Sequence, residues 1–356
     1  MLKGFKMVVS EVASQIRDRI PVSAIRAEDY VSTDNMRPNF GGIDTSSSSP
    51  PSGNVTAYQE GDILLSNIRP YFRKTWLATH SGGCNADVLC IRANPDKCLP
   101  KYLYYLFTTD NFVNDYLKSC KGAKMPRGDV QRLLDYEFDL PDLPTQLRIA
   151  GVLGSLDEKI ALNCKKIAEL ESLAKTVYEQ FVATKQCSYT TIRAEMPVTT
   201  GRRDSNFANK NGRYRFFTCS KEKLMCDEYE FDGKSVLLSG NGDLHVRFYD
   251  GCFNAYQRTY VLTPRNEKLF AATYFAVQAT LKRLTSGAAG SIVKFITKGD
   301  VERISIPIFP NEIPNLLNDQ FANILATEAA TEELIKLRDE LLPLLMNGQV
   351  TVGDLR

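Results

Sequence analysis

Arginine, lysine and asparagine side chains gather in two stretches of the chain, NIRPYFRK at 67–74 and TTGRRDSNFANKNGRYRFF at 199–217. Arginine can donate two hydrogen bonds to a guanine edge and asparagine can do the same with adenine, while lysine and arginine neutralise phosphates. Glycine-bearing loops near 121–127 and 241–247 add further candidates. The candidate DNA-contacting residues are Arg69, Tyr71, Arg73, Lys74, Lys121, Lys124, Arg127, Arg202, Arg203, Asn206, Lys210, Arg213, Asn241 and Arg247.

The positive charge of the chain is local. The formal net charge is only +2. Residues 117–132, however, carry five positive side chains against one negative, and residues 193–215 carry six against two. A solvated loop with incidental charge explains either cluster alone, but clusters in both halves favour contact with nucleic acid.

Motifs for catalysis are missing from the sequence. There is no GxxxxGK[ST] loop for a nucleoside triphosphate. The chain has only two histidines, which is few for a zinc site built from histidine or for a Ser-His-Asp triad. Pro141-Asp142 followed by Asp157-Glu158-Lys159 imitates a metal-nuclease pattern. Such carboxylates would bind magnesium only if they converged, and the second group falls inside an expected helix. We therefore expect a chain that is not an enzyme and has no metal site.

Composition places the chain among soluble folded proteins. Apolar residues make up 43% and charged residues 24% of 356 residues, enough for two domains or more. No apolar run approaches the roughly 18 to 20 residues that span a membrane, and the nine cysteines form no CxxC pair. We expect a cytoplasmic protein with reduced thiols and no membrane contact.

The elements that would position the basic loops occur twice in the same order. GDVQRL at 128–133 recurs as GDVERI at 299–304, and GDILLSN at 61–67 resembles GKSVLLSGN at 233–241. The matching pairs also include the helical patterns KYLYYLFTTDNFVNDYL and KLFAATYFAVQATLKRL and the strand-like runs YEFDLP and ISIPIFP. With Asn85-Ala86 and Asn254-Ala255, five matches at shifts of about 170 residues indicate an internal repeat. Asp129 is expected to cap a helix or turn rather than to contact DNA, as is Asp300.

A long amphipathic helix is predicted to follow each repeat. Apolar residues of the first recur in steps of four and three, the spacing of a coiled coil, with Asn163 as the only polar member. Its roughly 37 residues would extend about 55 Å. The second helix is less regular, with a phase slip near Glu328, and Pro343 should kink or end it. A core helix is the alternative for a short run. The predicted seam comprises Ile149, Leu153, Leu156, Ile160, Asn163, Ile167, Leu170, Ala174, Val177 and Phe181 in the first helix and Leu334, Leu337 and Leu341 in the second.

One segment lies outside the repeat. STDNMRPNFGGIDTSSSSPPSGNV at 32–55 is rich in serine, proline and glycine and is expected to be a mobile surface loop.

The chain from about residue 8 onward resembles the specificity subunit of type I restriction-modification systems. The resemblance depends on the duplicated plan and on GDILLSNIRP, LPTQLRIAGVLGSLDEKIALNCKKIAELESLAK and LIKLRDELLPLLMNGQV. It implies an α+β fold with a pseudo-twofold repeat, in which two globular target-recognition domains are separated by two helices in an antiparallel coiled coil. The expected parts are target-recognition domains at 1–144 and 186–312 and helices at 145–185 and 313–356.

The resemblance also implies the function and the partners. Each target-recognition domain would read one half of a bipartite site in double-stranded DNA, while the helices act as a spacer and dock DNA adenine methyltransferase subunits, two per chain. Motor-nuclease restriction subunits are further possible partners. S-adenosylmethionine, and ATP with magnesium, would bind those partner subunits, and this chain would hold no cofactor. The alternatives are a metal-dependent DNA nuclease and a coiled-coil scaffold without DNA readout.

Overall fold

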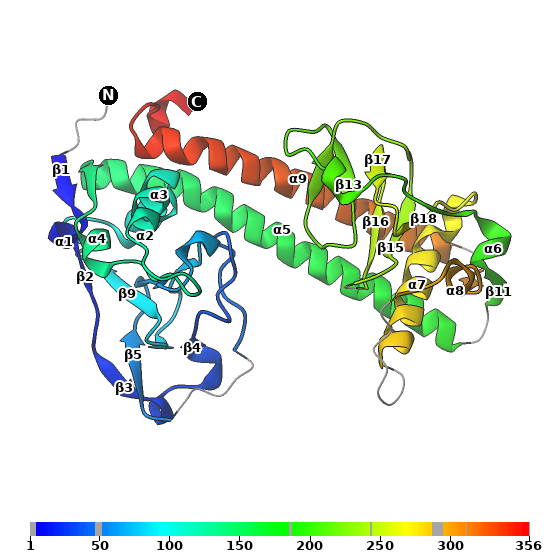
Figure 1. The fold of residues 1–356 in the computed structure, drawn as a ribbon, viewed down its shortest axis with the longest axis horizontal. Coiled ribbons are helices and arrows are strands. Elements are labelled where there is room, and N and C mark those ends of the chain that lie inside the picture. Colours follow the sequence, from blue (N-terminus) through cyan, green and yellow to red (C-terminus); the bar gives the residue numbers. More distant parts are fainter. Residues whose placement is uncertain are drawn as a thin grey trace. The chain divides into compact units, whose positions relative to one another are not determined.

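The computed structural model describes residues 5–46, 52–184, 187–242, 244–286, 295–310 and 312–355 (Figure 1). The chain forms two compact units. Unit 1 comprises Met1–Ile160 with Glu333–Arg356, and unit 2 comprises Ala161–Glu332. Two long helices, α5 (Leu143–Ala183) and α9 (Ile313–Met346), each contribute one part to either unit.

Unit 1 combines short strands with helices. Strand β1 pairs with β10, and the other strands form two four-stranded sheets of order β2-β9-β6-β7 and β3-β5-β8-β4. The helices are α1 (Val9–Val12), α2 (Pro100–Thr108), α3 (Asp110–Lys118) and α4 (Val130–Leu134). The strands are β1 (Phe5–Val8), β2 (Ala13–Gln15), β3 (Arg19–Pro21), β4 (Tyr30–Val31), β5 (Asn54–Tyr58), β6 (Ile63–Ser66), β7 (Thr75–Leu77), β8 (Gly82–Cys84), β9 (Val88–Ala93) and β10 (Glu137–Leu140).

Unit 2 repeats this plan. Strand β11 pairs with β19, and the remaining strands form sheets of order β12-β18-β15-β16 and β14-β13-β17. The helices are α6 (Ile192–Glu195), α7 (Phe270–Ser286) and α8 (Lys298–Glu302). The strands are β11 (Ser188–Thr191), β12 (Val198–Thr200), β13 (Tyr214–Phe217), β14 (Leu224–Cys226), β15 (Ser235–Ser239), β16 (Val246–Tyr249), β17 (Phe253–Ala255), β18 (Thr259–Leu262) and β19 (Ser305–Ile308).

The strand order confirms the predicted internal repeat. The sheet β2-β9-β6-β7 corresponds to β12-β18-β15-β16, and every neighbouring pair in both sheets is antiparallel. The antiparallel pair β1–β10 likewise corresponds to β11–β19. The α+β fold class predicted from the sequence is confirmed.

The two LLS runs are apolar throughout because each forms a strand that is buried on both faces. Ile63 and Leu65 of β6 belong to the main core of unit 1, whereas Leu64 belongs to a second, smaller core on the opposite face. Strand β15 divides in the same way, with Val236 and Leu238 on one face and Leu237 on the other.

The repeated GDV motif begins a short helix in each unit, as predicted. In unit 1 the Asp129 side chain accepts a hydrogen bond from the backbone N–H of Gln131 at 2.9 Å and so caps α4. In unit 2 Thr297 is the N-cap of α8, and Asp300 completes a capping box by accepting from the backbone N–H of Thr297 at 3.1 Å.

The helical pattern at 101–117 is interrupted in the structure. Thr109 ends α2 in an extended conformation and begins α3, where its hydroxyl accepts from the N–H of Phe112. A single helix over this stretch is therefore wrong for unit 1, whereas the corresponding α7 of unit 2 is continuous. A threonine that caps the next turn competes with the helical hydrogen bonds at this position.

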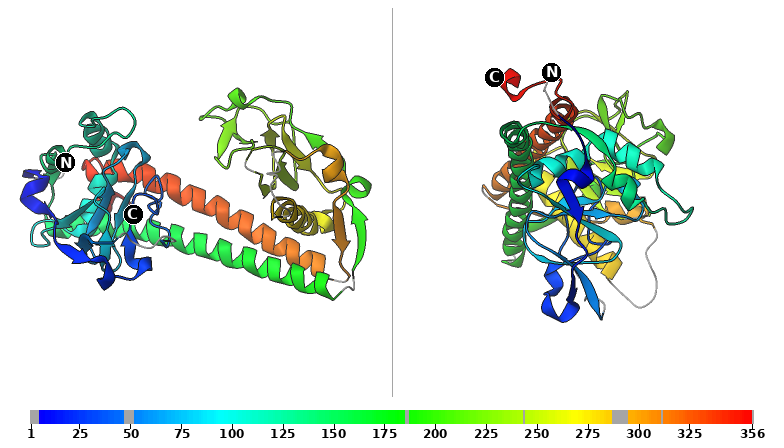
Figure 2. Two further views of the ribbon diagram at one scale, coloured as in Figure 1. Left: turned by 60° about the horizontal axis from the view of Figure 1, so that its bottom comes forward. Right: turned by 90° about the vertical axis from the view of Figure 1, so that its left-hand side faces the viewer.

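The long helices run in opposite directions within each unit (Figure 2). In unit 1 the first part of α5 packs with the end of α9, since Leu153 and Leu345 share a core. In unit 2 the end of α5 and the start of α9 share a core that includes Tyr178 and Phe321. Every predicted seam residue of α5 is buried or half-buried, Asn163 included. Coiled-coil packing itself stays a prediction.

The predicted seam of α9 is wrong at Leu337, which is 44% exposed, whereas Leu334 and Leu341 are half-buried like several seam residues of α5. A second row of buried and half-buried residues keeps steps of four and three through polar positions. It consists of Leu317, Phe321, Ile324, Glu328, Thr331, Ile335, Arg338, Leu342 and Leu345. Pro343 lies in the last turn, and α9 ends at Met346.

Arg338 is tolerated at its half-buried position in α9 because it has partners. Arg338 donates to Asp157 of α5 at 3.0 Å, and Asp157 also accepts from the hydroxyl of Tyr105 at 2.6 Å. Burial alone would lower the pKa of Arg338, but Asp339 and Asp157 outweigh it and raise that pKa. A sequence pattern that counts only apolar residues misses such a position.

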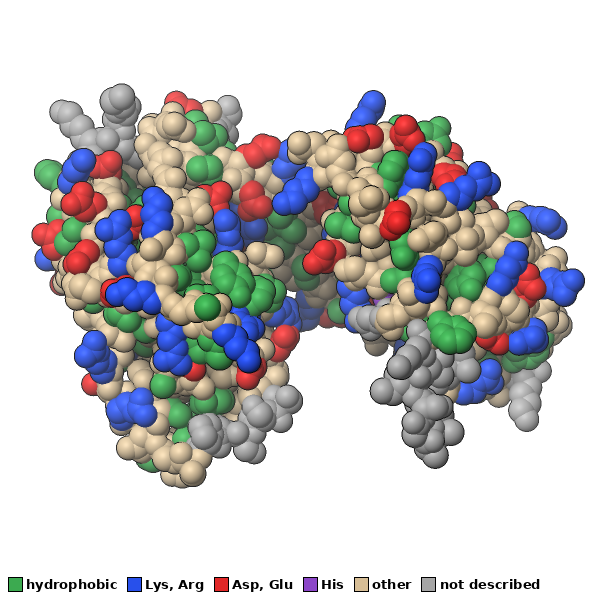
Figure 3. All heavy atoms as spheres, viewed as in Figure 1, with side chains coloured by type: hydrophobic (Ala, Val, Ile, Leu, Met, Phe, Trp, Pro, Cys, Tyr) green, Lys and Arg blue, Asp and Glu red, His purple; other side chains and the backbone are tan. Residues whose placement is uncertain are grey.

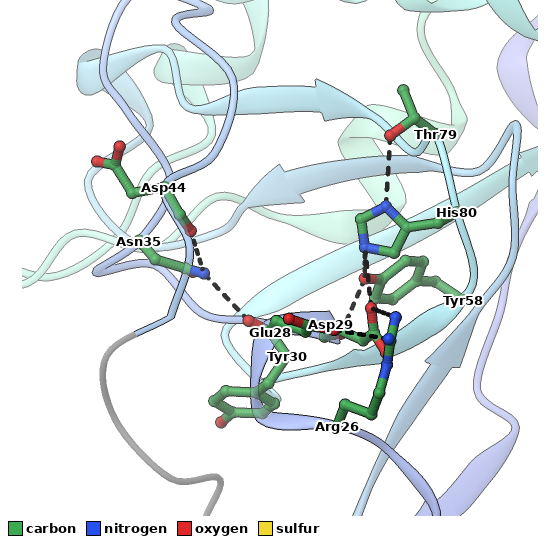
Figure 4. Close-up of polar contacts among 9 residues, drawn as sticks. All are labelled: Arg26, Glu28, Asp29, Tyr30, Asn35, Asp44, Tyr58, Thr79 and His80. Atoms are coloured by element: carbon green, nitrogen blue, oxygen red, sulfur yellow. Dashed lines mark hydrogen bonds and ion pairs between the residues drawn. The ribbon is translucent and has the colours of Figure 1, made fainter. Parts of the chain in front are cut away.

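Residues 32–46 form a loop with internal hydrogen bonds, and 47–51 lie outside the described residues. Mobility of this segment stays a prediction. The Asn35 amide donates to the carbonyls of Tyr30 and Asp44, both at 3.0 Å (Figure 4). Below this loop, the hydroxyl of Tyr58 donates to the carbonyl of Asp29 at 2.8 Å. The Asn35 contacts join the two ends of the loop to each other and to β4.

Candidate nucleic-acid interface

A strained turn follows the central strand of unit 1. Pro70–Phe72 form a single 3₁₀ turn, and the residues on either side adopt left-handed conformations, with φ of 48° at Arg69 and 53° at Arg73. We call residues 69–73 the aromatic turn, because Tyr71 is 48% and Phe72 41% exposed at its tip.

Two further segments hold the aromatic turn. The N–H groups of Asn39 and Phe40 donate to the carbonyls of Phe72 and Arg73, both at 2.9 Å. On the other side the N–H of Arg69 donates to the carbonyl of Pro126 at 2.8 Å. Asn39 and Phe40 also have positive φ, and with Arg69 and Arg73 they are the only non-glycine residues that do so in the described part of the chain. Such strain costs of order 1 kcal/mol or more per residue and gathers at functional sites.

Two of the predicted DNA-contacting cations position this turn. Arg73 forms an ion pair with Asp110 at 2.7 Å, and the Lys74 ammonium donates to the carbonyl of Thr33 at 2.6 Å. Lys74 also lies 5.9 Å from the centre of the Phe72 ring. The structure therefore places both side chains behind the tip.

The basic loop at 119–128 lies beside the aromatic turn. Lys121 and Lys124 are exposed, and Arg127 forms an ion pair with Asp87 at 2.8 Å. The Arg69 guanidinium reaches the carbonyl of Lys124 at 3.5 Å, while its Nε is buried without a hydrogen-bond partner among the described residues. A bridge between Ile68 and Arg127 joins the two segments. The segments that carry the seven candidates of unit 1 therefore lie side by side.

In unit 2 most candidates lie in the loop between β12 and β13. Arg202 pairs with Glu230 at 3.1 Å and Arg203 with Glu228 at 2.8 Å, and Arg203 also covers the ring of Phe207 at 4.5 Å. The other members, Asn206, Lys210 and Arg213, are exposed. Figure 3 shows such basic side chains mixed with acidic and hydrophobic ones on the visible face.

Two candidates of unit 2 lie apart from that loop. Asn241 forms a bridge with Phe295, beyond the segment 287–294 that lies outside the described residues. Arg247 lines a cavity of about 270 Å³ and donates to the carbonyl of Ser220, and burial lowers its pKa. The same cavity is lined by Glu171 of α5 and by Glu328 and Glu332 of α9. Arg247 therefore faces the long helices of its unit.

Sequence reasoning missed several residues that build the surface of unit 1. Asn39 and Phe40 belong to the segment that was expected to be a plain loop. Met125, which is 50% exposed beside Lys124, was not a candidate, whereas Phe72 belongs to the stretch NIRPYFRK. Asn39 was the one available indication of a turn in this segment, since asparagine adopts positive φ more readily than most residues.

The carboxylates of the nuclease-like pattern do not converge. Asp142 accepts from the N–H of Thr145 at 3.0 Å at the start of α5, and Asp157 is bonded to Arg338 and Tyr105. Fifteen residues of helix separate them by about 22 Å. No cluster of histidine, cysteine, aspartate or glutamate that suits a metal ion occurs within the described ranges.

The chain is internally duplicated: its two α+β units share one sheet order, and each carries exposed basic loops. Comparison with known proteins specifies the family. The model for the type I restriction modification DNA specificity domain matches residues 26–172 and 196–341, and the chain belongs to that family.

Relatives and a solved structure agree with this family. The chain is 36% identical to the type I restriction enzyme EcoDI specificity subunit of Escherichia coli over 165 residues, which cover 43% of this chain and 36% of that protein. It is 23% identical to the MjaIX specificity subunit of Methanocaldococcus jannaschii, over 84% of this chain and 79% of that protein. The fold is similar to the crystal structure of a type I restriction-modification S subunit from M. genitalium, with a TM-score of 0.65, 14% identity, and coverage of 97% and 96% of the two chains.

None of the helices in the described part of the chain is long and apolar enough to cross a membrane.

Proposed function

We propose that this chain is the DNA-recognition subunit of a type I restriction-modification complex. Each unit reads one half of a bipartite site in double-stranded DNA, and the chain itself does no catalysis. The observation that carries this proposal is the duplication. The first family match contains β6 and the aromatic turn, and the second contains β15 and the basic loop of unit 2.

The long helices serve as spacer and docking surface in this proposal. Each unit includes a piece of α5 whose outer face carries exposed leucines, Leu147 in unit 1 and Leu162 and Leu173 in unit 2. Exposed leucines on a regular helix suit packing against helices of another chain. The partners are DNA adenine methyltransferase subunits, two per chain, which bring S-adenosylmethionine. Motor-nuclease subunits, with ATP and magnesium, would join the complex in the same way.

A map of adenine methylation tests the proposal in the host, with and without the gene for this chain. We expect deletion to remove methylation from one split motif with two short halves and a fixed gap. Loss of a contiguous motif would contradict readout by two units. An unchanged map, combined with no sequence-specific DNA binding by the purified complex, would refute the proposal.

A further inference from the structure

The aromatic turn of unit 1 exposes apolar surface at the centre of a basic surface. Tyr71 and Phe72 have ring centres 4.7 Å apart, and Met125 is exposed on the neighbouring loop. Lys121 and Lys124 are exposed on the same loop as Met125. Phosphate contact explains the lysines, but it does not explain two aromatic rings held out into solvent.

The surrounding segments hold the backbone of the aromatic turn in place. Hydrogen bonds from Asn39, Phe40 and Arg69 hold its backbone, and the ion pair of Arg73 with Asp110 ties it to α3. Four left-handed non-glycine residues meet at this point. A rigid, strained display of two rings is the arrangement expected when the rings themselves make a contact, because preorganisation lowers the entropy lost on binding.

The geometry of the two rings suits contact with the edges of bases in a groove better than insertion between stacked base pairs. The planes of the two rings are inclined by 52°, so together they form a blunt tip that is too thick for a single base step. On the floor of the major groove the apolar group of a base pair is the 5-methyl of thymine, which aromatic side chains contact.

We propose that Tyr71 and Phe72 determine sequence specificity by contacting thymine 5-methyl groups in the half-site read by unit 1. The inference rests on the proposed function, and it adds a base-reading role for two named side chains. A half-site that contains a target adenine also contains a thymine on the opposite strand.

Replacement of thymine by uracil removes the methyl group and nothing else, and it tests the contact directly. The complex with its methyltransferase subunits is titrated with duplexes that carry one uracil at each thymine position in turn. We expect at least one position, confined to one half-site, to weaken binding about fourfold, which corresponds to one buried methyl group. Tyr71→Ala or Phe72→Ala should abolish the difference between thymine and uracil at that position.

Matched variants separate this role from simple damage to the fold. Tyr71→Phe keeps the ring and should keep the response to uracil. Phe5→Ala removes an aromatic side chain of the same unit that is 79% exposed on β1, outside this surface, and should also leave the response intact. Circular dichroism and the amount of methyltransferase that co-purifies report on folding and assembly.

The possible failures have different meanings. The inference is overturned if uracil is neutral at every position, or if its effect persists in both alanine variants while specific binding remains. It is also overturned if either alanine variant is folded but loses its methyltransferase, since the rings would then form a protein interface. A wild-type complex that binds scrambled duplex as tightly as the site would instead refute the proposed function.

Discussion

Several residues that were predicted to contact DNA have partners within the protein. Arg73 and Lys74 support the aromatic turn, Arg127 pairs with Asp87, and Arg202 and Arg203 pair with glutamates. An exposed ion pair is worth about 1 kcal/mol or less, so such an arginine can exchange its carboxylate for a phosphate at small cost. Lys121, Lys124, Lys210 and Arg213 are exposed.

Ionisation of Glu328 opposes folding of unit 2. Burial raises its pKa above 4.5, Lys223 and Arg215 oppose that shift, and Glu332 adds to it. Burial and Glu328 likewise raise the pKa of Glu171. Because the folded-state pKa exceeds the unfolded value, the native state holds the proton more tightly. Stability therefore falls as pH rises from about 4.5 through the folded-state pKa.

Glu328→Gln should raise the melting temperature at pH 7.5 by about 2 °C. The gain should disappear near pH 4.5, where the native carboxyl is protonated and carries no charge to bury. Thermal melts followed by circular dichroism at the two pH values measure this difference, with the exposed Glu333→Gln as control. A gain of equal size at both pH values would show that charge is not the cause.

At the level of elements, the aspartate of each GDV motif caps a short helix, but the glycines of the two motifs differ in how closely they are packed. A Cβ on Gly128 would lie 2.2 Å from the Tyr116 ring, whose hydroxyl donates to Asn67 at 2.6 Å beside the aromatic turn. A Cβ on Gly299 would find its nearest neighbour at 3.7 Å, at the end of the flexible Arg303 side chain. Only the first glycine is required by packing.

Gly128→Ala should lower the free energy of unfolding by about 1 to 3 kcal/mol, because the Tyr116 ring must move. Gly299→Ala should be neutral or slightly stabilising, since alanine favours a helix over glycine by up to about 1 kcal/mol. Urea denaturation of both variants compares them at positions that match in sequence. Equal destabilisation would mean that the motif itself requires glycine, independently of how closely neighbouring side chains pack against it.

The sequence predicted the elements better than their contacts. The repeat, the central strands β6 and β15 and the seam of α5 follow from local patterns of apolar residues and turns. The half-buried position of Arg338 in α9 did not, because it depends on Asp157, which is 181 residues away. The aromatic turn likewise depends on Asn39 and Phe40, which lie about 30 residues before it and have no periodic pattern. Contacts between distant segments leave little trace in a single sequence.

At the scale of the whole molecule, the duplication implies that the two half-sites are read separately. Arg202→Ala with Arg203→Ala should weaken binding to the half-site of unit 2 by about tenfold. The slope of log affinity against log salt should fall by up to about two, since each lost phosphate contact accounts for about 0.9. Titrations at several salt concentrations, together with methyltransferase co-purification, measure both effects.

Arg193→Ala is the matched control, because Arg193 is exposed on α6 of the same unit and was not a candidate. Duplexes with substitutions in one half-site identify which half has lost recognition. If the double variant lost its methyltransferase subunits and kept its DNA affinity, the assignment of the loop to DNA readout would be wrong.

The division of the chain into units also has a consequence for its synthesis. Unit 2 is one continuous stretch, whereas the core of unit 1 needs Leu345 and Met346 from the end of α9. On the ribosome, the unit that emerges first must therefore wait for residues that are translated after the whole of unit 2. Unit 2 can therefore complete its fold first. A premature stop codon within α9 would remove part of the core of unit 1 and so destabilise the unit that is encoded first in the gene.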